Sequence, residues 1–213
     1  MNPKSFIWAA RNEELTTLPP RDGGELVVHE PDVLKVESNR IYFYSDISRE
    51  TILKLNAKIR DLGASYVAEQ LYRDLEVPVP IYLHINSYGG NVFHGLSAMD
   101  SVLTSLTPVY SVVDGCCASA ATFMAVAAKK RLMQANAYMM IHQLSSTYWG
   151  KFTEFQDQME NLNAFMDKIK DIYAKYTKVP PEVLEELLKH DLWWDADQCL
   201  KYGLVDEIVQ RRV

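Results

Sequence analysis

Residues 108–143 constrain the possible folds of this chain more than any other stretch. An apolar strand ending near Val113 leads into a run of small residues around Ser119, and a helix of small and apolar residues continues to Lys130. A second apolar strand then carries His142 close to its end. A serine that opens a helix lies beside unpaired backbone N–H groups, which favour negative charge. With the histidine as base, the first hypothesis is nucleophilic acyl transfer.

The order of the elements predicts an α/β fold with a parallel sheet. A short aromatic strand at 40–45 precedes a helix capped by Ser48, which Gly63 is expected to break or bend. An apolar strand at 77–86, a glycine turn and a helix at 92–106 follow. The next stretch repeats this order of strand, turn and helix, as expected when parallel strands are joined by helices.

The C-terminal part is predicted to hold one long helix and several short elements. Apolar residues recur at helical spacing over 153–177, which at about 1.5 Å per residue gives a helix about 37 Å long. Such a length exceeds the needs of one internal helix, so part of its apolar seam is expected to meet another subunit. A short helix after Pro180, a helix capped by Asp195 and a strand at 204–209 complete the chain.

Length and composition favour one soluble domain without a nucleic-acid surface. The 213 residues contain no Pro/Gly/Ser-rich linker, so we expect an arm at 1–35, partly ordered, and one domain at 36–213. The formal charge of −6 argues against nucleic acid and anionic membranes as partners. No apolar run is long enough for a secretion signal or a membrane span, which predicts a cytoplasmic protein.

The cysteines and histidines predict neither disulfides nor a metal site. Cys116 and Cys117 are adjacent and Cys199 is distant, a spacing that suits buried thiols in a reducing compartment. The five histidines show no metal-ligand spacing. We therefore expect no metal and no cofactor.

From residue chemistry alone, the nucleophile and the base can be assigned but the acid cannot. Neither Ser119 nor His142 alone is a specific sign of catalysis. Together, on consecutive strand–helix units, they suggest a nucleophile and its base. Cys117 is a rival nucleophile, although no nearby cation favours its thiolate. Several carboxylates follow the histidine, and the choice among them stays open at this point: Glu185, Glu186, Asp191, Asp195 and Asp206.

Several motifs in the same order resemble ClpP, the serine peptidase of the caseinolytic protease system. They are Ile81-Tyr-Leu-His-Ile-Asn-Ser-Tyr-Gly-Gly90, Ala118-Ser-Ala120, Met140-Ile-His-Gln143 and Tyr202-Gly-Leu-Val-Asp206. The resemblance covers about Arg40 to Val209. It implies a ClpP/crotonase-like spiral of repeated ββα units with a protruding long helix, and serine endopeptidase activity.

The resemblance also implies which residues form the site. It selects Asp191 as the acid beside Ser119 and His142, and it places the oxyanion hole at the N–H groups of Gly90 and Ala120. An extended substrate would pair with the segment after Gly90 and with a glycine-containing strand at 143–150. The substrate-binding residues implied in this way are Gly89, Asn91, Val92, Gln143 and Gly150.

Assembly and partners follow from the same resemblance. ClpP-like proteins form heptameric rings, stacked in pairs as tetradecamers, with the sites inside a chamber and the long helix joining the rings. The resemblance implies that ATP is used only by a partner AAA+ unfoldase and not by this chain. A ClpP paralogue is a second partner that it allows. The location implied is the cytoplasm, that of a host cell for a phage-encoded protein, or an organelle matrix or stroma.

The sequence also departs from the family pattern, which suggests a divergent or specialised member. Tyr88 replaces the proline of the glycine turn, Leu144 replaces the proline after the histidine motif, and His190 replaces an arginine of the ring–ring contact. His84 stands where a surface aromatic is expected at the unfoldase docking site, although Tyr82 is kept. The helix after Ser48 is lengthened by an insertion within 57–73, and the arm does not resemble the axial loop of the family.

Two other functions are compatible with these residues. A crotonase-like acyl-CoA enzyme shares the spiral fold and an oxyanion hole, but has no need of Ser119, His142 and Asp191 together. A catalytically silent ring-forming scaffold or regulatory subunit would carry a misaligned triad. A Ser-Lys mechanism is disfavoured because Lys129 and Lys130 stand a helix away from the serine.

Overall fold

The computed structural model describes residues 33–209. The strands are β1 (Val33–Glu37), β2 (Arg40–Tyr44), β3 (Ile81–Ser87), β4 (Val109–Ala118), β5 (Lys130–Gln134), β6 (Tyr138–Met140), β7 (Trp193–Trp194) and β8 (Glu207–Val209). The helices are α1 (Arg49–Arg73), α2 (Val92–Leu103), α3 (Ala121–Val126), α4 (Phe152–Tyr176), α5 (Pro181–Leu187) and α6 (Ala196–Lys201). Predicted arm residues 1–32 lie outside the described part.

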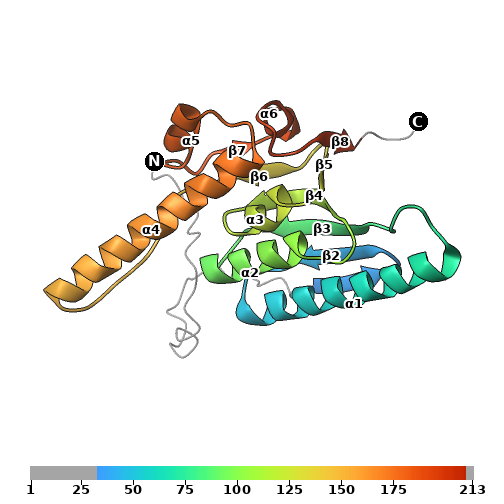
Figure 1. The fold of residues 1–213 in the computed structure, drawn as a ribbon. Helices are drawn as coiled ribbons and strands as arrows, with labels where there is room; N and C mark the ends of the chain where they lie inside the picture. Colours follow the sequence, from blue (N-terminus) through green and yellow to red (C-terminus); the bar gives the residue numbers. More distant parts are fainter. Residues whose placement is uncertain (1–32, 210–213) are drawn as a thin grey trace, which may run out of the picture. The chain divides into compact units, whose positions relative to one another are not determined.

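A mixed sheet carries the fold, with strands in the order β1-β2-β3-β4-β5-β8. The pairs from β2 to β8 are parallel, whereas β1 runs antiparallel to β2. Near its end β4 leaves β5 and pairs in parallel with β6, which pairs antiparallel with β7. The helices α1 and α2 lie side by side on one face of the sheet (Figure 1). These findings confirm the predicted α/β fold class.

The core lies between that face and the helices. Alternate residues Ile81, Leu83 and Ile85 of β3 are fully buried, because every second side chain of a strand points to the same face. On α1 the buried apolar positions are Ile52, Leu55 and Ile59, at helical spacing. Burial of a side chain of this size contributes about 1.5–3 kcal/mol, so this layer is a main source of stability.

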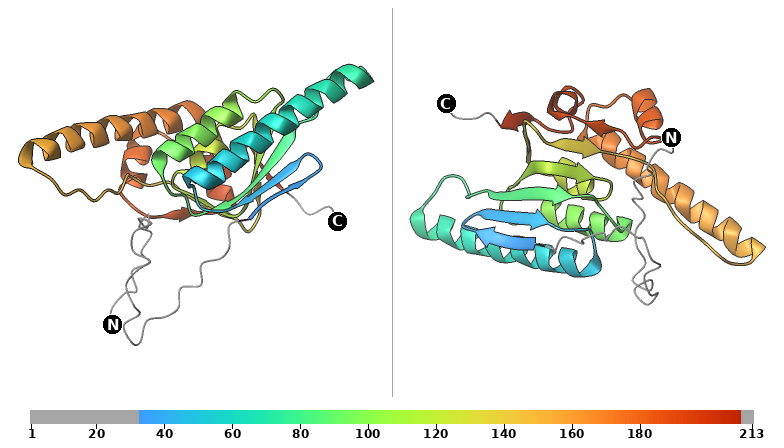
Figure 2. Two further views of the ribbon diagram at one scale, coloured as in Figure 1. Left: turned by 90° about the horizontal axis from the view of Figure 1, so that it is seen from below. Right: turned by 180° about the vertical axis from the view of Figure 1, so that it is seen from behind.

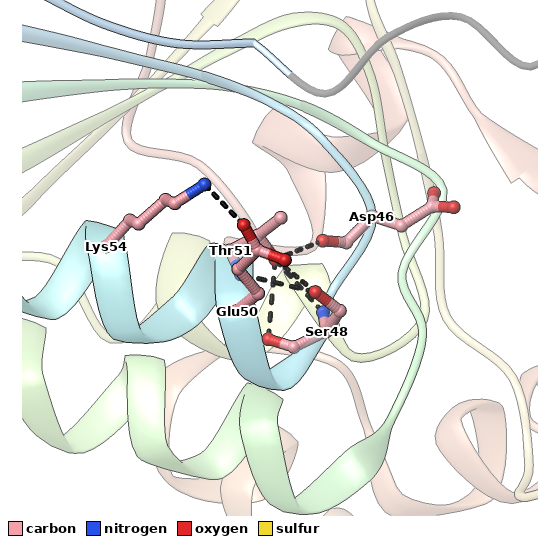
Figure 3. A network of polar contacts seen from close by, with 5 residues as sticks. All are labelled: Asp46, Ser48, Glu50, Thr51 and Lys54. Atoms are coloured by element: carbon pink, nitrogen blue, oxygen red, sulfur yellow. Dashed lines mark hydrogen bonds and ion pairs between the residues drawn. The ribbon is translucent and has the colours of Figure 1, made fainter. Parts of the chain in front are cut away.

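The start of α1 is fixed by a network of polar contacts (Figure 3). Ser48 is the N-cap: its side chain accepts a hydrogen bond from the Thr51 N–H, and the Thr51 side chain accepts one from the Ser48 N–H. The Thr51 hydroxyl also donates to the Asp46 carbonyl at 2.6 Å. The predicted cap is confirmed, and it holds the backbone on both sides of Ile47.

Two predicted features of the helices before β5 are wrong. Gly63 neither breaks nor bends α1, which is continuous from Arg49 to Arg73 (Figure 1). Gly63 faces Ser105 and Leu106, where an added Cβ would meet its nearest atom at 3.5 Å, so the helix packs against the segment after α2. The helix expected up to Lys130 ends at Val126, and Lys130–Gln134 forms the unpredicted strand β5. The unpredicted strand β1 begins at Val33, within the expected arm.

The long helix predicted at 153–177 is present as α4. Its buried residues, Ile169, Ile172 and Tyr173, all lie in its second half. In the first half, Phe152 is 78% exposed and Met159 is 59% exposed. Figure 2 shows this half reaching away from the sheet, with the chain that precedes α4 running beside it. The apolar seam is therefore only partly covered within one chain.

An ion pair joins β5 to the segment before β8. The carboxylate of Asp206 accepts hydrogen bonds from the Arg131 backbone N–H at 2.9 Å and from Nε at 3.0 Å. Burial acts to raise the pKa of Asp206, but the hydrogen bonds and charge of Arg131 outweigh it and hold this pKa below 3.8. A depressed pKa in the folded state means that ionised Asp206 stabilises the fold.

Replacing Asp206 with asparagine is expected to lower the Tm near neutral pH. The stabilisation by the carboxylate is complete above 3.8, the value in the unfolded chain, and is lost as the pH falls through the lower folded value. The difference in Tm between parent and variant should therefore shrink below pH 3.8. Thermal melts of both proteins across this range test the prediction, and a difference independent of pH contradicts it.

Candidate active site

The backbone of Ser119 is held in an unusual conformation just after β4. Its φ is +53°, in the left-handed region that non-glycine residues rarely adopt. The Ser119 N–H donates to the Met140 carbonyl at 2.9 Å, which continues the pairing of β4 with β6. The sharp turn between β4 and α3 thus presents a half-buried hydroxyl at the end of the sheet.

His142 lies two residues beyond β6 and reaches the serine directly. The imidazole Nε2 is 2.9 Å from the Ser119 Oγ. The Gln143 N–H donates to the Leu188 carbonyl at 2.7 Å, which fixes the backbone directly after the histidine. The parallel pairing of β4 and β6 brings serine and histidine together, because the carboxyl ends of both strands lie at the same edge.

Asp191 is the carboxylate that contacts the imidazole. Its Oδ1 lies 2.8 Å from the His142 Nδ1, and its side chain is 65% exposed. A carboxylate can only accept, so Nδ1 carries a proton and a neutral imidazole presents Nε2 as acceptor to the serine hydroxyl. The antiparallel pairing of Met140 with Trp193 places the acid beside the base. The structure thus brings all three predicted triad residues into one hydrogen-bonded chain.

The glycine turn after β3 packs directly against the serine. An added Cβ at Gly89 would lie 2.6 Å from the Ser119 Cβ, and one at Gly90 would lie 2.5 Å from the Ile47 carbonyl oxygen. Both glycines have positive φ, of +99° and +145°. The Ile47 N–H donates to the Gly89 carbonyl at 2.7 Å, and the Asn91 N–H donates to the Ile47 carbonyl at 3.0 Å. The capped start of α1 therefore positions this turn.

Two backbone N–H groups, one on this turn and one just beyond the serine, have no acceptor in the part of the chain that the structure describes. Within residues 33–209, neither the Gly90 N–H nor the Ala120 N–H donates a hydrogen bond to another protein group. The amide of Ala120 lies 3.2 Å from the position that a Cβ on Gly89 would take, so the turn runs past it closely. These are the two donors expected to form an oxyanion hole.

The predicted substrate-binding residues lie on the glycine turn, at the start of α2 and in the segment 143–150. Asn91 caps α2, accepting hydrogen bonds from Phe93 and His94, and Val92 is the first residue of that helix. The expected strand at 143–150 is absent: this segment has no strand pairing, and its first amide is used by Leu188. Gly150 lies in it, next to the start of α4. The predicted strand is therefore wrong for the single chain, because no partner strand pairs with the segment.

Three of the rival groups considered from the sequence have structural roles. Cys117 is fully buried, and this burial raises its thiol pKa well above 9.0. Asp195 caps α6 together with Gln198, as predicted, and Asp206 binds Arg131. Within residues 33–209 no three His, Cys, Asp or Glu side chains gather as metal ligands, and none of the helices has the length and hydropathy of a membrane span.

One expected surface residue is buried. His84 is only 6% exposed, stacks on Tyr42 and has an Nδ1 that lies 2.6 Å from Asp114. The Arg40 Nη1 lies 2.8 Å from the His84 Nε2, and since arginine can only donate, this nitrogen accepts and Nδ1 carries the proton. His84 is thus part of a polar cluster on β2, β3 and β4.

Sequence reasoning missed two residues that support the serine. The Thr122 hydroxyl donates to the Ser119 carbonyl at 2.6 Å and lies 2.7 Å from the Tyr173 hydroxyl. Thr122 and Tyr173 are 51 positions apart, and each was expected only to lie within a predicted helix. No local pattern signals such a contact.

Comparison with known proteins agrees with the fold and with the order of these elements. The family model for Clp protease matches residues 35–212. The ATP-dependent Clp protease proteolytic subunit 2 of Treponema pallidum (strain Nichols) is 30% identical over 180 residues, which cover 83% of this chain and 90% of the relative. The solved structure of an asparagine-to-aspartate mutant of ClpP1 from Listeria monocytogenes superposes with a TM-score of 0.69 at 24% identity, covering 82% of this chain and 93% of that one. A family model that matches most of the chain, together with a relative aligned over most of both chains, shows that the chain belongs to the Clp protease family.

Proposed function

We propose that this chain is a serine endopeptidase that hydrolyses peptides or unfolded protein with Ser119 as nucleophile, His142 as base and Asp191 as the orienting acid. The observation that carries the proposal is the pair of contacts at 2.9 Å and 2.8 Å that links the serine hydroxyl, the imidazole and the carboxylate. Both distances suit hydrogen bonds, and the tautomer that the carboxylate selects leaves Nε2 able to take the serine proton.

In the first step, the Ser119 Oγ attacks the carbonyl carbon of the scissile peptide bond while His142 takes the hydroxyl proton. We expect the oxyanion that forms to accept hydrogen bonds from the Gly90 and Ala120 N–H groups, which have no acceptor within residues 33–209. His142 then gives its proton to the leaving amine as the C–N bond breaks. Water, deprotonated by the same imidazole, releases the acyl group and restores Ser119.

We further propose that the chain works as a homo-oligomeric ring, heptameric and stacked in pairs, that encloses the sites. The exposed apolar residues on the first half of α4 support this, because patches of this kind mark contact sites between proteins. An ATP-driven AAA+ unfoldase or a ClpP paralogue is the proposed protein partner. The chain itself needs no cofactor for this chemistry, because every group that it uses is a side chain or a backbone amide.

Labelling with a fluorophosphonate tests the proposal. The assembled parent protein should be modified at Ser119 and should cleave a fluorogenic peptide, whereas Ser119→Ala should lose both reactions and keep the same native mass. Peptide cleavage that persists in Ser119→Ala contradicts the assignment. An assembled parent that is inert to the probe identifies a silent scaffold instead, and binding of acyl-CoA identifies a crotonase-like enzyme.

A further inference from the structure

The strained backbone of Ser119 needs support from its surroundings. A non-glycine residue at φ +53° is disfavoured and persists only where neighbouring groups hold it. Three hydrogen bonds do so: its N–H donates to the Met140 carbonyl, and its own carbonyl accepts from the Thr122 N–H at 3.0 Å and from the Thr122 hydroxyl at 2.6 Å. Two of the three supports therefore come from one residue.

The direction of the hydrogen bonds around Thr122 follows from the groups involved. The Ser119 carbonyl has no proton, so the threonine hydroxyl must donate to it. That hydroxyl has a single proton, so its contact of 2.7 Å with the Tyr173 hydroxyl has tyrosine as donor. The hydrogen bonds thus run in one direction, from Tyr173 through Thr122 to the carbonyl of the nucleophile.

Both hydroxyls lie in the dry interior. Thr122 is 0% exposed and Tyr173 is 1% exposed, so water does not compete for either group. Burial raises the pKa of the Tyr173 phenol, which keeps its proton available for donation. Tyr173 belongs to the packed second half of α4, whereas Thr122 belongs to α3 directly after the serine. The contact therefore ties the long helix to the nucleophile.

We propose that Thr122 and Tyr173 are positioning residues that set the backbone conformation of Ser119 and thereby aim its hydroxyl at the His142 Nε2. The proposal rests on the proposed peptidase function. Neither residue touches the reacting atoms. Thr122 acts on the serine by donating a hydrogen bond to the Ser119 carbonyl. Tyr173 acts through Thr122: it donates to the threonine oxygen, which leaves the threonine proton directed at Ser119.

The two hydroxyls could instead serve only the stability of the fold. Four variants distinguish this structural role from a positioning role. Thr122→Val keeps the shape of the side chain but leaves the Tyr173 hydroxyl buried without a partner, so it should lower both Tm and kcat. The double variant Thr122→Val/Tyr173→Phe removes both hydroxyls, which restores most of the Tm because no buried donor is left unpaired. Thr122→Ser keeps the donor, and Tyr173→Phe removes only the orienting group.

If the two residues position Ser119, kcat across the variants should depend on whether the Thr122 hydroxyl is present and not on the Tm of the variant. We expect kcat to fall about tenfold in Thr122→Val and to stay low in the double variant, a factor typical of the loss of one hydrogen bond. Thr122→Ser should retain kcat within about threefold and Tyr173→Phe should lose about threefold, with KM unchanged throughout because substrate contacts are untouched. The rate of fluorophosphonate labelling should follow kcat.

The experiment measures kcat, KM, labelling rate and Tm for the parent and the four variants at equal native mass. Recovery of kcat together with Tm in the double variant overturns the proposal, and so does an unchanged kcat in Thr122→Val. A parent chain that neither cleaves nor reacts with the probe overturns the proposed peptidase function itself, before any variant is compared.

Discussion

Replacing His142 with alanine is expected to lower kcat for peptide hydrolysis by about 10⁴-fold or more. Its Nε2 is the only basic group in contact with the Ser119 hydroxyl among the described residues, at 2.9 Å. Without it no group takes the serine proton, and only the amide donors and substrate contacts still favour the reaction. The measurement is steady-state cleavage of a fluorogenic peptide at matched native mass.

His190→Ala is the matched control for the loss of an imidazole. The imidazole of this histidine is exposed and contacts Glu186 at 3.0 Å, away from the triad, so its removal should leave kcat unchanged in particles of parental mass. Asp191→Asn should cost less than His142→Ala, about 10²-fold, because water can replace part of the contribution of a carboxylate that is 65% exposed. A kcat for His142→Ala within about tenfold of the parent would refute the assigned base.

Replacing Gly89 with alanine is expected to abolish hydrolysis and to destabilise the fold. The new Cβ would lie 2.6 Å from the Ser119 Cβ and 2.7 Å from the Ala118 carbonyl oxygen, so the turn or the serine must move. The φ of +99° adds backbone strain for any residue with a side chain. Together these effects should lower the free energy of unfolding by about 2–5 kcal/mol.

The control for this change is Gly63→Ala, in the interior of α1. An added Cβ there meets its nearest atom at 3.5 Å, an ordinary contact, and no unusual φ is required. Alanine favours helix over glycine, so Gly63→Ala should stabilise the chain by about 0.5–1 kcal/mol and leave kcat unchanged. Urea unfolding gives the free energy of unfolding of both variants, and cleavage of a fluorogenic peptide gives their kcat. A Gly89→Ala protein with parental activity would show that the turn does not pack against Ser119 as described.

The sequence allowed the first two members of the site to be predicted because both follow local rules. Ser119 stands where a strand of apolar residues turns into a helix, and His142 closes the next apolar strand. Parallel strands bring such ends to one edge of a sheet, so proximity follows from order along the chain. The Ser48 and Asp195 caps were predictable for the same reason, since a cap involves residues only three positions apart.

Asp191 could not be selected by its own pattern. It precedes a strand of two residues, and its place beside His142 depends on the pairing of β7 with β6 and on the bond from Gln143 to Leu188. These contacts join segments far apart in the chain, so no local periodicity reports them. The resemblance to ClpP supplied what residue chemistry left open among five acids.

The failures of prediction also have physical causes. No glycine or proline separates the helix before it from Lys130–Gln134, so the sequence gives no sign that the helix ends there. The first two residues of this strand are charged and the strand is only partly buried, so it lacks the apolar pattern of a core strand. His84 was expected at the surface because the resemblance to ClpP implies a surface aromatic at this position, but its partners Asp114 and Arg40 satisfy both ring nitrogens and allow burial. The hydroxyl pair of Thr122 and Tyr173 depends on how α4 docks, which no short window of sequence contains.

The two ends of the triad differ in burial, so different changes disturb Asp191 and Ser119. At the acid end, Asp191 faces water, so dissolved ions within a Debye length of about 8–10 Å weaken its attraction for a protonated imidazole. At the alcohol end, the supports of Ser119 are sealed from solvent and respond to steric changes in the interior instead. Ionic strength and core mutations therefore act on opposite ends of the same hydrogen-bonded triad.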